Sequence, residues 1–248
     1  MYKKYFVPVL FLLISFPVFA QNVVKEITPQ RQLWLAFFNQ TRLSDRWGLW
    51  LDLHARTIGD DFANRWNTQI FRPGVTYFLS DQVRLTAGYA YVRHYPATSD
   101  GDVRPEHRPW QQLAWSGRLG RFYLNQWIRA EQRYNRRTSN GQLQDGYTFN
   151  HRFRYMFFLQ IPLTKPQMQP GVPNFVFQNE LHLNAGKQIT YNYFDQNRFF
   201  VGFSYPFSKS LTLQAGYMNL FQQLPAGNRF ANNHVARLFL FQTLDFRQ

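Results

Sequence analysis

The side chains best suited to chemistry are arginines and glutamates that alternate along two neighbouring segments. Arg129, Glu131 and Arg133 share one face if their segment is extended, because successive strand residues point to opposite faces. Arg152 and Arg154 share a face of the next segment. Sequential strands usually pair, so we expect cross-strand Arg–Glu contacts. The other expected members of this polar network are Arg72, Arg84, Glu180, His182 and Arg198.

Two interpretations of the network remain open. Charges that cannot face lipid pair inside a narrow barrel and hold it together, which is the simpler interpretation. Alternatively, a lumen lined by arginine selects anions, and a small anionic solute is then a partner. No cofactor and no metal site are predicted, because HExxH and phosphate-binding glycine motifs are absent and cysteine is missing.

An outer-membrane lipid-modifying enzyme of the acyl hydrolase type is the enzymatic alternative. Such an enzyme needs a serine oriented by a histidine. No histidine of the chain has a serine two positions later, although distant strands could still bring the two together. Ser116 and Ser204 lie in predicted strands. We predict no catalytic residue, and Gly202 and Gly216 fit strand bends or tight packing.

The elements that must position these residues are strands, because the dominant period is two. From Trp47 to Arg56, an apolar face with Leu49 and Leu53 alternates with a face that carries Asp52 and Arg56. Most such segments have about ten residues, as tilted transmembrane strands do. Eleven segments are expected, with starts near Gln32, Trp47, Trp66, Val83, His107, Arg121, Thr148, Asn174, Phe194, Leu211 and Asn233.

The connections alternate in length, as in an up-and-down antiparallel barrel. Short turns are expected at 44–46, 80–82, 117–120 and 208–210, with longer loops at 58–65, 96–106, 135–147, 185–193 and 222–232. Residues 162–173 are an exception, since this long proline-rich stretch stands where a short turn is due. Bacterial barrels have an even number of strands. We therefore predict about twelve strands, with 22–28 as an additional first strand, or alternatively ten.

The composition indicates an exported protein. A basic start and a short apolar stretch that ends at Ala20 predict a cleaved signal peptide over 1–20 and one barrel domain over 21–248. The chain has no cysteine, so it cannot rely on disulfides. The net charge of +14 would suit a nucleic-acid partner, but export argues against one.

Three features favour a barrel in the membrane over a soluble periplasmic barrel that binds an apolar ligand. Aromatic residues gather near segment ends, as interface belts require. The polar faces carry arginine and hardly any lysine, whereas a water-exposed sheet would carry lysine. The last segment closes on Phe246, as is typical of clients of the outer-membrane assembly machinery. We therefore expect the outer membrane of a Gram-negative cell, with lipid and that machinery as partners.

Short spaced pieces of the chain carry a family resemblance. They are 33–35 (LWL), 71–74 (FRPG), 129–133 (RAEQR), 152–155 (RFRY), 161–163 (IPL) and 194–198 (FDQNR). In order and spacing they resemble an outer-membrane β-barrel family known as domain of unknown function 2490. The resemblance implies a transmembrane barrel and brings no activity. The expected function is thus a structural or narrow-pore barrel with an arginine-rich lumen.

Overall fold

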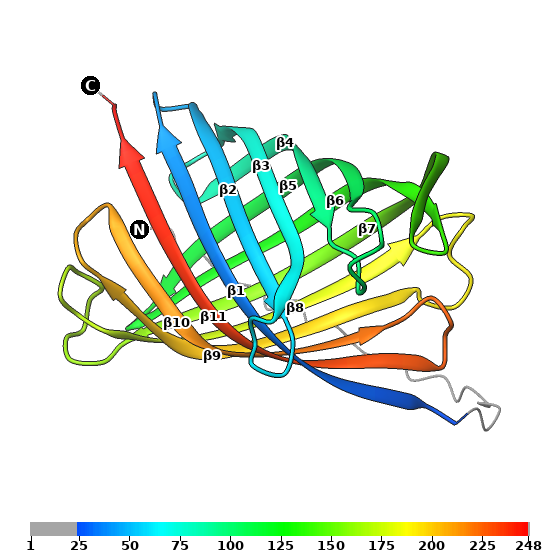
Figure 1. Ribbon diagram of the computed structural model, residues 1–248. Helices are drawn as coiled ribbons and strands as arrows, with labels where there is room; N and C mark the ends of the chain where they lie inside the picture. Colours follow the sequence, from blue (N-terminus) through cyan, green and yellow to red (C-terminus); the bar gives the residue numbers. More distant parts are fainter. Residues whose placement is uncertain (1–23, 248) are drawn as a thin grey trace, which may run out of the picture.

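The structure, a computed structural model, describes residues 24–247, and every regular element in them is a strand (Figure 1). The predicted signal peptide therefore lies outside the described residues. No helix long and apolar enough to cross a membrane occurs in the described part of the chain. The strands are β1 (Glu26–Arg42), β2 (Trp47–Ile58), β3 (Arg65–Phe78), β4 (Val83–His94), β5 (Arg104–Leu119), β6 (Phe122–Ser139), β7 (Gln142–Pro162), β8 (Asn174–Ala185), β9 (Phe194–Pro206), β10 (Leu211–Gln223) and β11 (Arg229–Asp245).

The strands form one closed barrel. Each strand from β2 to β11 pairs antiparallel with the strand before it, and β1 pairs parallel with β11 to close the sheet. The all-β barrel is thus confirmed, but both predicted counts are wrong, because the described residues form eleven strands. An odd number of up-and-down strands places the first and last in the same direction, and a parallel ladder satisfies their backbone groups. The additional strand predicted at 22–28 is not found in its described part, residues 24–28, because β1 begins at Glu26 and is the first expected segment. Residues 22 and 23 lie outside the described residues.

Most of the predicted connections are found, with one clear error. The short turns lie at 43–46, 79–82, 120–121 and 207–210, and we call this end of the barrel the turn end. The connections 59–64, 95–103, 186–193 and 224–228 lie at the opposite end, the loop end. The loop predicted at 135–147 is wrong, because β6 and β7 continue to a two-residue turn at Asn140 and Gly141. Both turn residues have positive φ (49° and 81°), as the tight hairpin turn for which Asn-Gly is preferred requires.

The polarity of the wall is opposite on its two faces. In β2, Trp47, Leu49 and Leu53 are exposed on the outer face, whereas Asp52 is fully buried inside. The same alternation continues around the barrel, so that most exposed large hydrophobic side chains belong to strands and most buried side chains of the strands are polar or charged. The period of two therefore assigned the two faces correctly.

Two apolar clusters occupy part of the interior. The larger contains Trp34, Phe200 and Met218 and lies on β1 and β8 to β11. The smaller is built around Trp110, whose side chain is fully buried. The remaining interior is filled by charged and amide side chains, most of them on β2 to β9. The core therefore combines apolar clusters with buried charges, and each buried charge needs an ion-pair or hydrogen-bond partner to offset its loss of hydration.

Contacts at the turn end join neighbouring turns. Arg42, the last residue of β1, donates hydrogen bonds to the Asp45 carbonyl oxygen at 2.7 Å and to Asp81 at 2.6 Å. The hydrogen bond and the charge of Arg42 hold the pKa of the Asp81 carboxyl below its ordinary value. This exposed network links the β1–β2 turn to the β3–β4 turn.

Candidate functional site: a charged barrel interior

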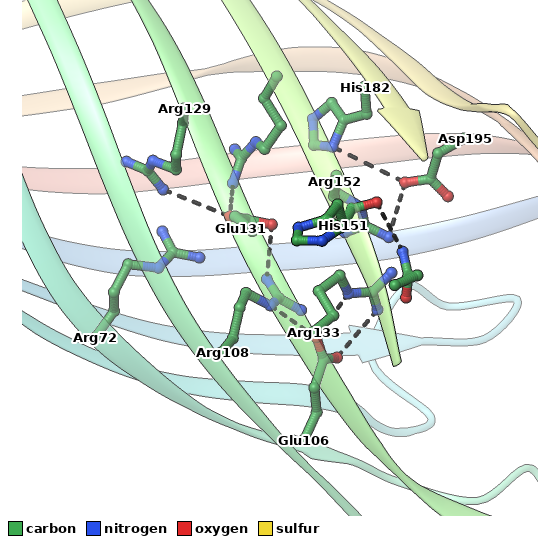
Figure 2. Close-up of polar contacts among 12 residues, drawn as sticks. Arg72, Glu106, Arg108, Arg129, Glu131, Arg133, His151, Arg152, His182 and Asp195 are labelled. Atoms are coloured by element: carbon green, nitrogen blue, oxygen red, sulfur yellow. Dashed lines mark hydrogen bonds and ion pairs between the residues drawn. The ribbon is translucent and has the colours of Figure 1, made fainter. Parts of the chain in front are cut away.

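Glu131 lies at the centre of the interior charges. The β6–β7 register places Glu131 opposite Arg152 and Arg129 opposite Arg154, as cross-strand pairing of the two segments requires. Arg154 donates to Glu131 Oε1 at 2.6 Å, and Arg108 of β5 lies 3.5 Å from Oε2. Arg129 approaches Oε1 at 3.9 Å. One fully buried carboxylate therefore faces three guanidinium groups (Figure 2).

Glu106 of β5 is a second fully buried carboxylate with several cationic partners. Arg108 donates to its Oε1 at 2.8 Å, and Arg133 of β6 donates to both carboxylate oxygens, at 2.6 and 3.0 Å. His94 of β4 lies 2.8 Å from Oε2. Arg108 contacts both Glu106 and Glu131 and so links these two centres.

Glu180 of β8 is the third centre. Arg154 donates to its Oε1 at 2.7 Å, and His182 lies 3.0 Å from the same oxygen. Arg198 of β9 is 3.6 Å from Oε2. Arg154 thus bridges Glu180 and Glu131, so that the network runs without a break from β4 to β9.

Asp195 enters the network through a bulge in β9. The β8–β9 register jumps from the pair His182–Gln196 to the pair Leu183–Phe194, and Asp195 is left without a cross-strand partner. A bulge of this kind re-aims a side chain. Asp195 is consequently buried, and its Oδ2 lies 2.8 Å from Arg152 (Figure 2). Strict alternation would place this carboxylate outside.

All ten side chains expected in the network lie on the inner face, and eight of the nine arginines and glutamates among them belong to ion pairs. Arg72 pairs with Asp52 at 2.8 Å. Arg84 is the exception, since it has no carboxylate within 4 Å among the described residues. The sequence patterns do not single out five further members of the network, which are Asp52, Glu106, Arg108, Asp195 and Arg237.

Some arginines are held wholly or partly by amides and aromatic rings rather than by carboxylates. Arg237 of β11 donates to Gln178 at 3.0 Å and stacks on the Phe200 ring at 3.4 Å. Arg129 donates to Gln112 at 2.6 and 2.9 Å. Arg56 of β2 has neither a carboxylate nor a hydrogen-bond partner in residues 24–247, and its guanidinium carbon lies 3.6 Å from the centre of the Trp34 ring. These arginines place positive charge in the interior that carboxylates of the protein do not fully neutralise.

The interior encloses a cavity of about 570 Å³. Its lining includes Asn125 and Thr212 near the turn end as well as His94 and Gln222 near the loop end. The cavity therefore extends along most of the length of the barrel. The arginines that line it are Arg56, Arg72, Arg84, Arg108, Arg129, Arg133, Arg152, Arg154, Arg198 and Arg237. Only five carboxylates are buried against these ten arginines, which leaves an excess of five positive charges.

The serines considered as nucleophiles bond elsewhere. Ser116 donates to the Gln82 carbonyl oxygen, and Ser204 accepts from Gln160 at 2.9 Å. Neither forms a hydrogen bond to a histidine within residues 24–247. Among those residues there is also no group of three histidine, aspartate or glutamate side chains arranged to hold a metal ion.

The fold and the interior define a class, that of closed β-barrels with an apolar outer wall and a charged inner one. The chain belongs to the family described as "Protein of unknown function (DUF2490)", whose model matches residues 31–231. It is also similar to an uncharacterized protein of Methylorubrum extorquens, with 28% identity over 174 residues, which are 69% of this chain and 71% of that protein. No solved structure matches the chain.

Proposed function

We propose that this protein is an outer-membrane β-barrel whose narrow, arginine-lined lumen lets small anions pass. The observation that carries the proposal is the polarity of the wall, with exposed hydrophobic side chains outside and buried charges inside. A soluble barrel in water would need the opposite arrangement, because exposed apolar area of this extent costs free energy in water. In lipid the same outer face is favourable.

Aromatic side chains at both ends of the barrel support a membrane position. Trp47, Tyr205 and Phe207 are exposed at the turn end, and Trp66 and Tyr193 at the loop end. Tryptophan and tyrosine prefer the two membrane–water interfaces, because their rings are apolar and their N–H or O–H groups stay in contact with water.

The polar groups on the outer face also fit a lipid surrounding. Gln111 and Gln132 exchange two hydrogen bonds, at 3.3 and 3.1 Å, and Asn179 and Asn197 exchange two more, at 3.1 and 3.2 Å. An amide in hydrocarbon is costly unless its donors and acceptors are bonded. Each amide here donates one hydrogen bond to its partner and accepts one from it, which lowers the cost of placing these positions in lipid.

The excess of positive charge along the lumen supports the passage of anions. Rings of arginine lower the electrostatic barrier for anions and raise it for cations. The pairing of eight site residues explains the stability of the wall, and the unbalanced arginines then determine which ions enter. In this proposal the outer-membrane assembly machinery and lipid are the partners, and the loop end faces the cell exterior.

Two measurements test the proposal. Cell fractionation should recover the protein in the outer-membrane fraction, from which only detergent extracts it. Release of the protein into buffer without detergent would contradict the proposal. Refolded protein in a planar bilayer with a KCl gradient should give small channels whose reversal potential has the sign of a chloride current. A barrel that inserts but never conducts would be structural only, and selectivity for potassium would contradict the role of the arginines.

A further inference from the structure

We infer that Arg56, Arg198 and the ring of Trp34 form a binding site in the lumen for a small organic dianion, such as a phosphate monoester. The inference deepens the proposed function, and it rests on that function for a lumen that solutes can enter. Arg56 has no carboxylate within 4 Å among residues 24–247. Its Nε is buried and has no hydrogen-bond partner.

A second cation converges on the same ring. The guanidinium carbons of Arg56 and Arg198 lie 3.6 and 5.0 Å from the centre of the Trp34 ring. Arg198 shares its carboxylate, Glu180, with Arg154 and His182. Arg198 donates from Nε to Gln196 at 2.9 Å, so the donors left for a ligand are its terminal N–H groups and those of Arg56. Guanidinium N–H groups match the oxygens of a phosphate or carboxylate.

The Trp34 ring, which both cations contact, is held in place. Trp34 Nε1 donates to Gln32 Oε1 at 2.7 Å, and Gln32 in turn donates to Asn233 at 2.6 Å. Trp34 and Gln32 are both nearly fully buried. A site whose side chains are already positioned loses little conformational entropy on binding.

The surroundings of Trp34 indicate that the ligand is organic. Trp34 packs with Met218, Leu220 and Phe239, and all four side chains line the cavity. An inorganic anion would leave this apolar wall in contact with water. The cavity volume, about 570 Å³, lies in the range of small-molecule sites. A ligand with one dianionic end and one apolar end would contact both the arginines and this wall.

The unbalanced charge gives such a ligand its driving force. Ten arginines line the cavity against five buried carboxylates. An isolated buried cation is unfavourable, and a bound dianion would neutralise two of the surplus charges. The ligand should therefore stabilise the folded barrel as well as bind to it.

Calorimetry on the full-length barrel in detergent micelles tests the site, with phenyl phosphate, inorganic phosphate and phenol as probes. Phenyl phosphate should bind at least tenfold more tightly than inorganic phosphate, because only its ring reaches the apolar wall. Phenol should bind at least tenfold more weakly than phenyl phosphate, because it lacks the dianion. Equal affinities for all three probes, or no binding of phenyl phosphate, would overturn the inference.

A matched pair of variants assigns the site to Arg56. Arg56→Gln should weaken phenyl phosphate at least tenfold and should also abolish the rise in unfolding temperature that the ligand causes. Arg93→Gln removes the same charge from an exposed position on the outer face of β4 and should leave the affinity within twofold. Equal weakening by the two variants would mean a general effect of charge and would overturn the site.

The outcome can be separated from that of the proposed function. Chloride-selective conductance without phenyl phosphate binding would support the pore and contradict the binding site. If Arg56→Gln abolishes binding in a barrel that does not conduct, the result would support the binding site and contradict the pore.

Discussion

At the scale of single residues, the interior depends on carboxylates that serve several arginines at once. Glu131 is fully buried and lies within 4 Å of Arg108, Arg129 and Arg154. Burying these charges is costly, and only their mutual attraction and hydrogen bonds offset the cost. Loss of one carboxylate would leave three guanidinium groups with less compensation, whereas loss of one arginine would leave the carboxylate with two partners.

Glu131→Gln should therefore destabilise the barrel by about 3–5 kcal/mol, since a buried ion pair loses one partner. Glutamine has the same shape and still accepts a hydrogen bond, so the loss reports the charge. Urea unfolding in lipid vesicles, followed by tryptophan fluorescence, measures the effect. Glu26→Gln is the control, because Glu26 and Arg229 form an ion pair with 59% and 61% of their side chains exposed. Exposed pairs contribute little, so a similar loss in both variants would contradict the argument.

The sequence predicts much of this network and misses members for identifiable reasons. Alternation alone places Arg129, Glu131 and Arg154 on the inner face. Glu106 is missed because β5 begins at Arg104, before the expected start near His107. Arg108 lies inside the expected segment, but the sequence pattern does not assign its face to the network. Asp195 cannot be found by alternation, since it points inward only because β9 bulges there. A bulge depends on the register of two strands, which no single segment encodes.

At the scale of elements, two pairs of glycines let aromatic rings lie flat against the inner wall. Gly74 of β3 faces Gly88 of β4 beneath Trp110, and Gly202 of β9 faces Gly216 of β10 beneath Phe200. A Cβ atom at any of these four positions would approach the covering ring to 3.0 Å or less. Glycine pairs in strands permit such close packing, and the ring replaces the missing side chains. The tight-packing role expected for Gly202 and Gly216 is thereby found.

Gly88→Ala should destabilise the barrel by about 1–3 kcal/mol, because the new methyl group overpacks a filled interior. Its Cβ would lie 2.7 Å from the Gly74 Cα and 3.0 Å from the Trp110 ring. Gly117→Ala is the matched control, because an added Cβ meets nothing within 4 Å there. Thermal unfolding followed by circular dichroism should show a lower transition for Gly88→Ala only. Equal transitions would contradict the close packing of Gly88 against the β3 backbone and Trp110.

Strand boundaries are predicted unevenly from the sequence. The starts of β2, β4, β8, β9 and β10 agree with the structure, because a short turn or a proline-rich stretch precedes most of them. The starts of β1, β5, β7 and β11 are placed three to six residues too late, because polar residues at the loop end resemble loops. In β6 and β7 these polar residues form a hairpin that extends past the neighbouring strands (Figure 1).

At the scale of the whole molecule, closure is the feature that sequence patterns do not determine. Period-two alternation identifies each strand and its inner face, but it contains no information about which strands meet at the seam. The eleven expected segments correspond to eleven strands, and the correction to twelve or ten rested on the rule of an even count. Here β1 and β11 meet in parallel over the full length of both strands, from Glu26–Arg229 to Arg42–Asp245.

This seam can be tested by a disulfide bond, because the chain has no cysteine of its own. Leu33 and Ala236 face each other across the seam. Neighbouring strands lie about 4.8 Å apart, within the range that a disulfide needs. Leu33→Cys with Ala236→Cys should therefore crosslink on oxidation, and the product should show a reducible shift in gel mobility. Leu33→Cys with Leu244→Cys, about 26 Å further along β11, should not crosslink. An even-stranded barrel, with antiparallel closure, would leave the first pair uncrosslinked and would contradict the parallel seam.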